Sequence, residues 1–381
     1  MKITFIFPLL LLACIQVQCQ QTKKEHATAP AVKIVFQGQP RTEKEYEIST
    51  EKDILLPFNN LIVDAAYPFS EGRALVNINE QYQYIDTNGN LLPFKFKRTS
   101  EMPGSFRQGR AKIYSRREKY GFIDLSGKLV IDTIYSYVHD YFSESLAFVV
   151  RSGFRGFIDR DGKEVIPIDK KYHIIFPFGH NIAIVSDMKK FGAIDKKGQQ
   201  VIPLEFADIE EFQEGFARAK KTEDGPWGLI DTKGNFVIEP KHPELSNVSE
   251  GLVSYKDEHT QRYGFLDTAG NVKIKPIFQY ADDFSNGLAA VSNDDYKEGY
   301  IDKEGKLVID FRFKETSGFS EGLAVASIEV TDSTRNYTRP QYGYINTNGE
   351  WVFPPIYDLA MNFSEGKALI FKKKWSYIQR K

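Results

Sequence analysis

The chain is poor in cysteine and methionine. Its 381 residues include four methionines and only two cysteines, Cys14 and Cys19, which both lie within the first twenty residues. The rest of the chain can therefore form no disulfide bond. It also offers no thiol nucleophile and no cysteine ligand for a metal.

An excess of charge of one sign is also absent. The sequence has 50 Lys and Arg against 51 Asp and Glu, a formal net charge of −1. A protein that neutralises nucleic-acid phosphates needs a basic face, so this balance argues against nucleic acid as a partner. After the first 19 residues no apolar run reaches the length of a membrane-spanning helix, about 18 residues.

Aromatic residues and turn formers are abundant instead. The chain has 29 Phe, 20 Tyr, 28 Gly and 17 Pro, and 41% of its residues are hydrophobic. Phe and Tyr favour strands, while Gly and Pro favour turns. This composition predicts an all-β fold with a sizeable core and excludes wholesale disorder.

The first 19 residues have the pattern of an export leader. Lys2 is followed by the apolar run Ile3–Ala13, which suits a signal peptide but is too short to span a bilayer. Leu11–Cys14 resembles a lipobox, in which Cys14 is lipidated, whereas cleavage after Cys19 would release a soluble chain. Both alternatives predict an exported protein, either an outer-membrane or periplasmic lipoprotein or a secreted one.

The rest of the chain divides into a tether and a repeat domain. Residues 20–53 begin with the polar stretch Gln20–Pro30 and include a possible cap strand at Val32–Phe36. Residues 54–381 form the predicted repeat domain.

Two phrases recur nine times in this domain. The first is aromatic-Gly-x-Ile-Asp-x-x-Gly, and its clear copies contain Gly121, Gly156, Gly192, Gly228, Gly264, Gly299 and Gly343. Two degenerate copies carry Gln83 and Ser376 in place of the glycine. The second, Phe-Ser-Glu-Gly-Leu-Ala, precedes each first phrase and begins at Phe69, Phe106, Phe142, Phe178, Phe212, Val248, Phe284, Phe319 and Phe363. Successive copies of the first phrase lie 33 to 44 residues apart, the longest spacing containing an insertion.

Each unit is predicted to form about three short antiparallel strands. A run such as Leu323–Ala326 suits the first strand, the Gly-x-Ile-Asp phrase the second, and a run such as Gln200–Pro203 the third. The aspartate can bond backbone N–H groups ahead of it, and the glycine accepts the left-handed φ that such a turn requires.

The units must stack, because one alone cannot bury its Phe, Ile and Tyr side chains. They could form an open curved array, or a closed β-propeller in which Ile54–Pro57 supplies a strand that the last unit lacks. A unit of about 36 residues is short for a four-stranded blade. We therefore favour the open array, with the copies that contain Gln83 and Ser376 as its caps.

These phrases, above all Trp227–Gly234, resemble the WG-repeat family of bacterial proteins over residues 54 to 381. The resemblance implies a tandem β-repeat module that varies in copy number, often follows a secretion signal and has no established catalytic activity. Arg155 and Glu298 depart from the pattern because they replace the aromatic residue before the glycine. The segment 178–183 departs because it loses Ser-Glu-Gly.

The recurring acids are the main candidates for chemistry. The aspartates of the first phrase raise the hypothesis of calcium sites, and the glutamates of the second that of a glycosidase pair. Neither set has the ligand density or the pairing that such sites need, so we interpret both as turn residues. The histidines show no zinc spacing, and no nucleophile elbow or phosphate loop occurs. We expect no catalytic residue, metal or cofactor.

Three residues stay as candidates for contact with a ligand. Arg155 and His180 break the repeat pattern, and Trp351 lies outside both phrases and could stack on a sugar or a partner. The sequence favours a non-enzymatic scaffold that binds an envelope or extracellular protein. A glycan- or peptidoglycan-binding module is the alternative, and a polysaccharide-active hydrolase is a third.

Overall fold

The computed structural model describes residues 63–94, 101–115, 117–332, 337–372 and 374–379. The predicted leader with Cys14, the tether and the strand at Ile54–Pro57 lie outside these residues. The chain divides into the units Met1–Ile48 and Ser49–Lys381, and the fold described below belongs to the second.

The described residues form nine small antiparallel sheets in tandem, which we call blades 1 to 9. Blades 1 to 3 contain β1 (Ala65–Ala66), β2 (Arg73–Ile78) and β3 (Gln81–Asp86); β4 (Ala111–Tyr114), β5 (Tyr120–Ile123) and β6 (Leu129–Tyr135); and β7 (Tyr137–Val138), β8 (Leu146–Arg151), β9 (Phe154–Asp159) and β10 (Glu164–Pro167). Blades 4 and 5 contain β11 (Ile174–Gly179), β12 (Ile182–Ser186), β13 (Phe191–Asp195) and β14 (Gln200–Phe206); and β15 (Asp208–Ile209), β16 (Phe216–Lys220), β17 (Trp227–Asp231) and β18 (Phe236–His242). Blades 6 and 7 contain β19 (Leu252–Lys256), β20 (Tyr263–Asp267) and β21 (Val272–Phe278); and β22 (Tyr280–Ala281), β23 (Ala289–Ser292), β24 (Glu298–Ile301) and β25 (Leu307–Phe313). Blades 8 and 9 contain β26 (Leu323–Asp332), β27 (Tyr337–Asn346) and β28 (Trp351–Tyr357); and β29 (Leu359–Ala360), β30 (Lys367–Lys372) and β31 (Lys374–Gln379).

The prediction of an all-β tandem fold is confirmed, although several blades contain one strand more than expected. In four of the sheets, a strand just before the second phrase adds to the three predicted strands. This strand is only two residues long in β7, β15 and β22. A four-stranded blade therefore fits within a unit of about 36 residues.

The glycine of the first phrase is required by the outer strand. The register shifts where β18 pairs with β17, and a Cβ added to Gly228 would lie only 2.6 Å from the carbonyl oxygen of Ile238. Any side chain there would push the outer strand away. Gln83 and Ser376 replace the glycine in the two blades where, among the described residues, no strand lies beyond β3 and β31.

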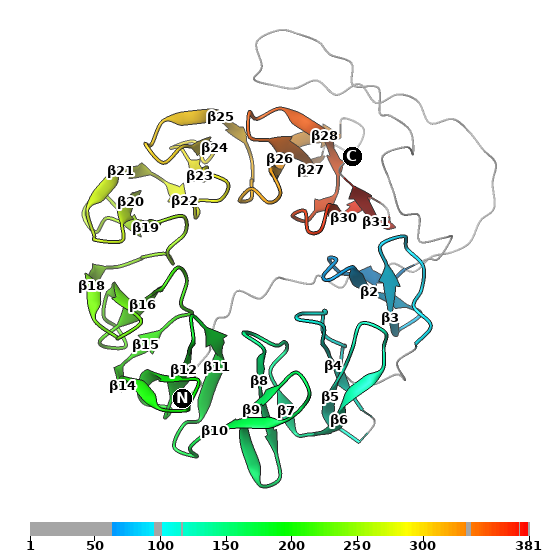
Figure 1. Cartoon of the computed structure of the whole chain (residues 1–381). Coiled ribbons are helices and arrows are strands. Elements are labelled where there is room, and N and C mark those ends of the chain that lie inside the picture. Colours follow the sequence, from blue (N-terminus) through cyan, green and yellow to red (C-terminus); the bar gives the residue numbers. More distant parts are fainter. Residues whose placement is uncertain (1–62, 95–100, 116, 333–336, 373, 380–381) are drawn as a thin grey trace, which may run out of the picture. The chain divides into compact units, whose positions relative to one another are not determined.

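Blade 9 packs directly against blade 1. The Oγ of Ser364 donates a hydrogen bond of 3.0 Å to the carbonyl of Phe69, and the hydroxyl of Tyr377 donates to the carbonyl of Tyr67. The rings of Phe69 and Tyr377 lie 4.8 Å apart between centroids, inside one apolar cluster shared by the two blades. The blades thus follow one another around a closed ring (Figure 1), which is the arrangement of a β-propeller.

The preference for an open array is therefore wrong, and the closed alternative is correct. An open stack would leave the apolar faces of its first and last units in water, whereas closure buries each against the other. The copies with Gln83 and Ser376 are not caps, because they belong to blades that are neighbours in the ring.

Candidate binding surfaces

The two recurring phrases meet at the same end of a blade. In blade 6, Leu252 of the second phrase pairs with Asp267 of the first phrase. The hairpin between the two central strands lies at the opposite end. We call the end of the ring with the two phrases the turn face, and the end with these hairpins the hairpin face.

On the turn face, a side chain of one blade accepts hydrogen bonds from backbone amides of the next. Glu214 of blade 5 accepts from Glu250 and Gly251 of blade 6 at 2.7 and 2.9 Å. Glu365 of blade 9 accepts from Gly72 of blade 1 at 2.7 Å, so the series continues across the ring closure. The same position supplies an acceptor at Glu71, Gln108, Glu144, Glu250 and Glu321. We call the six glutamate side chains the carboxylate latches, and Gln108 supplies an amide oxygen at the same position.

The serine of the second phrase forms a parallel series. Ser143 of blade 3 donates from Oγ to the carbonyl of Phe178 in blade 4 at 2.6 Å. The same bond is made by Ser70, Ser249, Ser285, Ser320 and Ser364. We call these the serine latches. The two series show what the recurring Glu and Ser side chains do, and they support the interpretation of the glutamates as turn residues.

Charge also stabilises some of the carboxylate latches. Burial alone would raise the pKa of Glu250, but the ammonium of Lys303, 3.0 Å away, and the amide of Gly287 together lower it below its ordinary value. An ionised carboxylate is the stronger hydrogen-bond acceptor.

The aspartates of the first phrase close their own turns. One oxygen of Asp267 accepts from the amides of Ala269 and Asn271 at 3.0 and 2.8 Å, and the other accepts from the Asn271 side chain. These bonds, led by the one from the Asn271 side chain, lower the pKa of Asp267. The carboxylate oxygens are thus already used as acceptors, which supports turn formation over calcium ligation.

The structure separates the three predicted contact residues. His180 lies exposed on the turn face of blade 4, with a left-handed φ of 53°, at the position of a carboxylate latch. Arg155 is half-buried in β9 and donates to the carbonyl of His173 at 2.9 Å. Trp351 is half-buried at the start of β28, 5.6 Å from the ring of Phe313. The three form no common site, and Arg155 and Trp351 make contacts within the fold.

The hairpin face carries the exposed tyrosines, which the sequence analysis missed. Tyr137, Tyr280, Tyr296 and Tyr337 are 48 to 66% exposed and belong to blades 3, 7 and 8. Tyr137 and Tyr280 pair with residues at the hairpin ends of their neighbouring strands, Tyr296 lies in a hairpin turn, and Tyr337 begins β27. Met188, 67% exposed, lies in the hairpin of blade 4. The sequence signal that could have identified these residues is their position at the hairpin between two predicted strands, outside both repeated phrases.

Half-buried tyrosines lie beneath this surface and bond to acids. The hydroxyl of Tyr263 donates to Glu244, and Tyr342 donates to Glu315 at 2.6 Å. The bond from Tyr263 holds the pKa of Glu244 below its ordinary value, and Lys256 adds to this effect from 2.9 Å. The hairpin face therefore combines tyrosine rings with carboxylates that accept hydrogen bonds from tyrosine hydroxyls.

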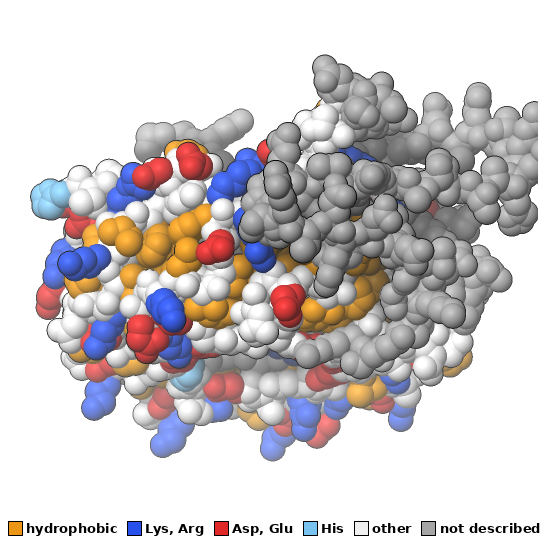
Figure 2. All heavy atoms as spheres, turned by 90° about the horizontal axis from the view of Figure 1, so that it is seen from above, with side chains coloured by type: hydrophobic (Ala, Val, Ile, Leu, Met, Phe, Trp, Pro, Cys, Tyr) orange, Lys and Arg blue, Asp and Glu red, His pale blue; other side chains and the backbone are white. Residues whose placement is uncertain are grey.

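A third surface, the outer rim, is aliphatic. Figure 2 shows a band of hydrophobic side chains along the rim with charged side chains on both sides of it. Val201, Val308 and Val352 of the outer strands are 39 to 45% exposed. Pro203 and Pro354 and the register shifts of these strands protect the edges from pairing with another strand.

The described residues contain neither a cluster of metal ligands nor a membrane-spanning helix. Within them, no group of three or more His, Cys, Asp or Glu side chains is placed to hold a metal ion. They also include no helix with the length and apolarity to cross a membrane.

Comparison with known families agrees with this geometry. The model of the WG containing repeat matches residues 61–82, 120–153, 156–187, 191–223, 227–258, 263–296, 299–329 and 342–374. The chain belongs to the WG-repeat family. A comparison with curated protein sequences finds no match.

Solved structures resemble this WG-repeat chain at low identity. A crystal structure of the eukaryotic initiation factor is 12% identical, with a TM-score of 0.55, over 84% of this chain and 91% of that one. BamB from Moraxella catarrhalis is 11% identical, with a TM-score of 0.37, over 70% and 94% of the two chains. PorZ, a surface component of the type-IX secretion system of Porphyromonas gingivalis, is 9% identical, with a TM-score of 0.30, over 84% and 52%. The likeness to the initiation factor shows the fold alone.

Proposed function

We propose that this WG-repeat protein is a non-enzymatic scaffold that binds another protein at the bacterial cell envelope, through its hairpin face. The observation that carries the proposal is the gathering of the exposed tyrosines on that face. Tyrosine is enriched in protein interfaces because its ring gives a large contact area at low conformational cost and its hydroxyl keeps a polar contact.

The latches also favour a rigid scaffold. Bonds from blade to blade fix the positions of the hairpins, so a partner that contacts several blades meets a preorganised surface. Little ordering entropy is then lost on binding.

The export part of the proposal rests on the leader-like residues 1–19, with Cys14 as the lipidation site. Cells that express the full chain are labelled with radioactive palmitate, and a Cys14→Ser variant is the control. Label on the wild type that is lost in the variant supports a lipoprotein. An unlabelled chain in the medium contradicts lipidation and favours the soluble secreted form.

The binding part is tested by capture on the immobilised chain from residue 20. Detergent-solubilised envelope proteins and purified sacculi are offered separately to the wild type and to a Tyr280→Ser/Tyr296→Ser/Tyr337→Ser variant. A Val201→Thr/Val308→Thr/Val352→Thr variant of the outer rim is the matched control.

The proposal predicts that one discrete envelope protein is retained by the wild type and the rim variant, and at least tenfold less by the tyrosine variant. Equal retention by the wild type and both variants would contradict binding through the hairpin face. Salt-resistant binding of sacculi without any protein would instead support the glycan alternative.

A further inference from the structure

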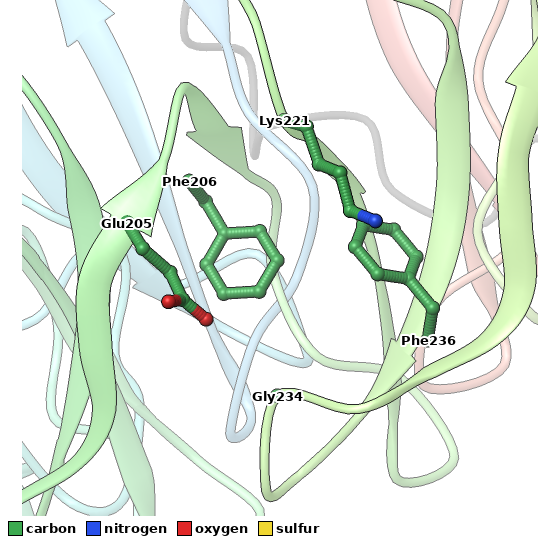
Figure 3. A pocket seen from close by; sticks show the side chains of 5 residues that line it. All are labelled: Glu205, Phe206, Lys221, Gly234 and Phe236. Atoms are coloured by element: carbon green, nitrogen blue, oxygen red, sulfur yellow. The ribbon is translucent and has the colours of Figure 1, made fainter.

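A pocket of about 450 Å³ lies in the groove between blades 4 and 5, and none of the exposed tyrosines of the hairpin face lines it. Phe206 of β14 and Phe236 of β18 lie in its wall with their ring centroids 5.7 Å apart. Glu205, Lys221 and Gly234 complete the lining (Figure 3).

The pocket has one exposed charge of each sign. Within the described part of the chain, neither Glu205 nor Lys221 forms an ion pair. The Nζ of Lys221 lies 4.8 Å above the ring of Phe236, and Figure 3 shows the carboxylate of Glu205 at the other side of the Phe206 ring. A ligand in this groove would therefore meet an aromatic wall between an anion and a cation.

We call the interface between two neighbouring blades a joint. The joint between blades 4 and 5 lacks both latches, although the Nζ of Lys190 donates to the carbonyl of Lys221 across it at 3.5 Å. Gly179 and His180 stand where other blades carry the serine and carboxylate latches, and neither bonds to blade 5. Ala193 stands where most blades place a ring against the next blade, such as Phe157 against Phe178 at 4.6 Å. Apolar packing carries most of this joint.

The groove between blades 7 and 8 is a natural comparison, because its residues occupy equivalent positions. Phe313 and Trp351 form the aromatic pair there, with centroids 5.6 Å apart. Arg312 replaces Glu205, lies 5.0 Å from the centroid of the Phe313 ring and donates to the carbonyl of Gly349 in blade 8. Arg312 thus bridges the second groove, whereas Glu205 leaves the first one open.

We propose that the groove between blades 4 and 5 binds an extended peptide segment through one aromatic side chain flanked by a basic and an acidic residue. The ring would pack on the half-buried Phe236, beside the buried Phe206, and the charged neighbours would face Glu205 and Lys221. A neutral sugar offers a ring face but no charges, so the two charged walls favour a peptide.

The test uses blocked tripeptides and the full chain. Lys-Phe-Glu and Glu-Phe-Lys, with capped termini, are titrated against the protein and followed by amide NMR at Lys221 and Gly234 and by calorimetry. Lys-Ala-Glu is the control without a ring, and N-acetylglucosamine tests the sugar source. The proposal predicts saturable shifts with at least one Phe peptide and at least tenfold weaker binding of the Ala peptide.

The decisive variant is Glu205→Arg, which copies the arginine of the other groove. It should weaken the Phe peptide at least tenfold while the melting temperature stays equal or rises, because the new guanidinium can bridge to Gly234. Unchanged affinity in this variant, no shift with either Phe peptide, or binding of the sugar in place of the peptides would overturn the proposal.

The lining of this site contains none of the exposed tyrosines of the hairpin face. The Tyr280→Ser/Tyr296→Ser/Tyr337→Ser variant should therefore bind the Phe peptide with wild-type affinity. If that variant no longer binds the peptide, the placement of the site is contradicted. If it loses binding of the envelope protein alone, the result bears only on the proposed scaffold function of the hairpin face.

Discussion

The joint between blades 9 and 1 and the joint between blades 4 and 5 come from the same repeat but are held differently. At the first joint, Ser364 and Glu365 bond to blade 1, and Tyr377 packs on Phe69 and donates to a backbone carbonyl of blade 1. The Nζ of Lys367 lies 5.3 Å above the same Phe69 ring. At the second joint, Gly179, His180 and Ala193 leave these three positions without a bond or a ring pair.

The difference lies in the residues at each joint and not in chain continuity alone. The joint between blades 6 and 7 is covalently continuous, yet Ser249, Glu250 and the pair of Phe265 with Phe284 form the same set of contacts there. Blades 9 and 1 are far apart in sequence, and bringing them together costs loop-closure entropy, so their joint depends on the full set. Blades 4 and 5 stay neighbours through the chain itself, since β14 ends at Phe206 and β15 begins at Asp208, which leaves their joint free to present a groove.

The largest expected effect comes from truncating one phenylalanine at each joint. Phe69→Ala and Phe212→Ala both empty a core position, which costs about 3–5 kcal/mol. Phe69→Ala should cost about 0.5–1.5 kcal/mol more, because it also loses the pair with Tyr377. Urea unfolding measures both, and an equal or larger loss at Phe212 would contradict the ranking of the joints.

Removing a carboxylate latch should have a smaller effect. Glu365→Ala loses the bonds to the amides of blade 1 and should cost about 1–2 kcal/mol, at the lower end because the site is solvent-exposed. His180→Ala is the matched control, since His180 and Glu365 have nearly the same φ, 53° and 54°. The control should change the free energy of unfolding by under about 0.5 kcal/mol. Equal losses in the two variants would show that the latch does not stabilise the ring.

Building the missing latches should strengthen the weaker joint. A Cβ at Gly179 would lie 3.9 Å from the carbonyl oxygen of Phe212, so Gly179→Ser places a hydroxyl near that acceptor. His180→Glu adds a carboxylate in a backbone conformation that Glu214 also adopts, with φ of 51°. Together they should add about 1–2 kcal/mol. A melting temperature that does not rise would contradict the geometry assigned to the latches.

The smallest expected effect is a pH dependence of stability at the joint between blades 5 and 6. His242 is 8% exposed, its Nε2 finds no hydrogen-bond partner among the described residues, and burial lowers its pKa below the ordinary 6.5. The folded protein keeps it neutral while the unfolded chain protonates near 6.5. Its contribution to stability is therefore complete above that pH and is lost as the pH falls through the lowered pKa.

His242→Phe places the residue found at the equivalent positions Phe206 and Phe278. The variant should lose less stability than the wild type between pH 7 and 5, as measured by thermal melts. Identical pH profiles would show that His242 does not titrate in this way. His139, whose pKa is also lowered by burial, should cause the pH dependence of stability that remains in this variant.

The repeat, its strands and its turns could be predicted from the sequence because they depend on local residues. Asp267 and the glycine that follows it specify their turn by bonds within a few residues. Ring closure could not be predicted, because it depends on contacts such as Tyr377 to Tyr67, more than 300 residues apart. The role of Glu in the second phrase was invisible for the same reason, since its partner amides lie one blade further on.

The candidate site was predicted only in part. His180 was selected because it breaks a repeated phrase. In the structure its consequence is that blade 4 has no carboxylate latch to blade 5. Tyr296 and Glu205 were missed, because residues outside the repeated phrases have no pattern to break. Trp351 was selected as an aromatic free for contact, but Arg312 and Phe313 show that its groove is already bridged.

The central claim is a closed ring that is latched from blade to blade, and amide hydrogen exchange of three glycines tests it most directly. Gly72 and Gly251 donate to Glu365 and Glu214, whereas Gly215 lies at the joint between blades 4 and 5, where His180 takes the place of a carboxylate latch. We expect slow amide exchange at Gly72 and Gly251 and faster exchange at Gly215. In Glu365→Ala, exchange should become fast at Gly72 and stay unchanged at the other two glycines. Exchange at Gly72 that is as fast as at Gly215 and unchanged in that variant would contradict the closed, latched ring.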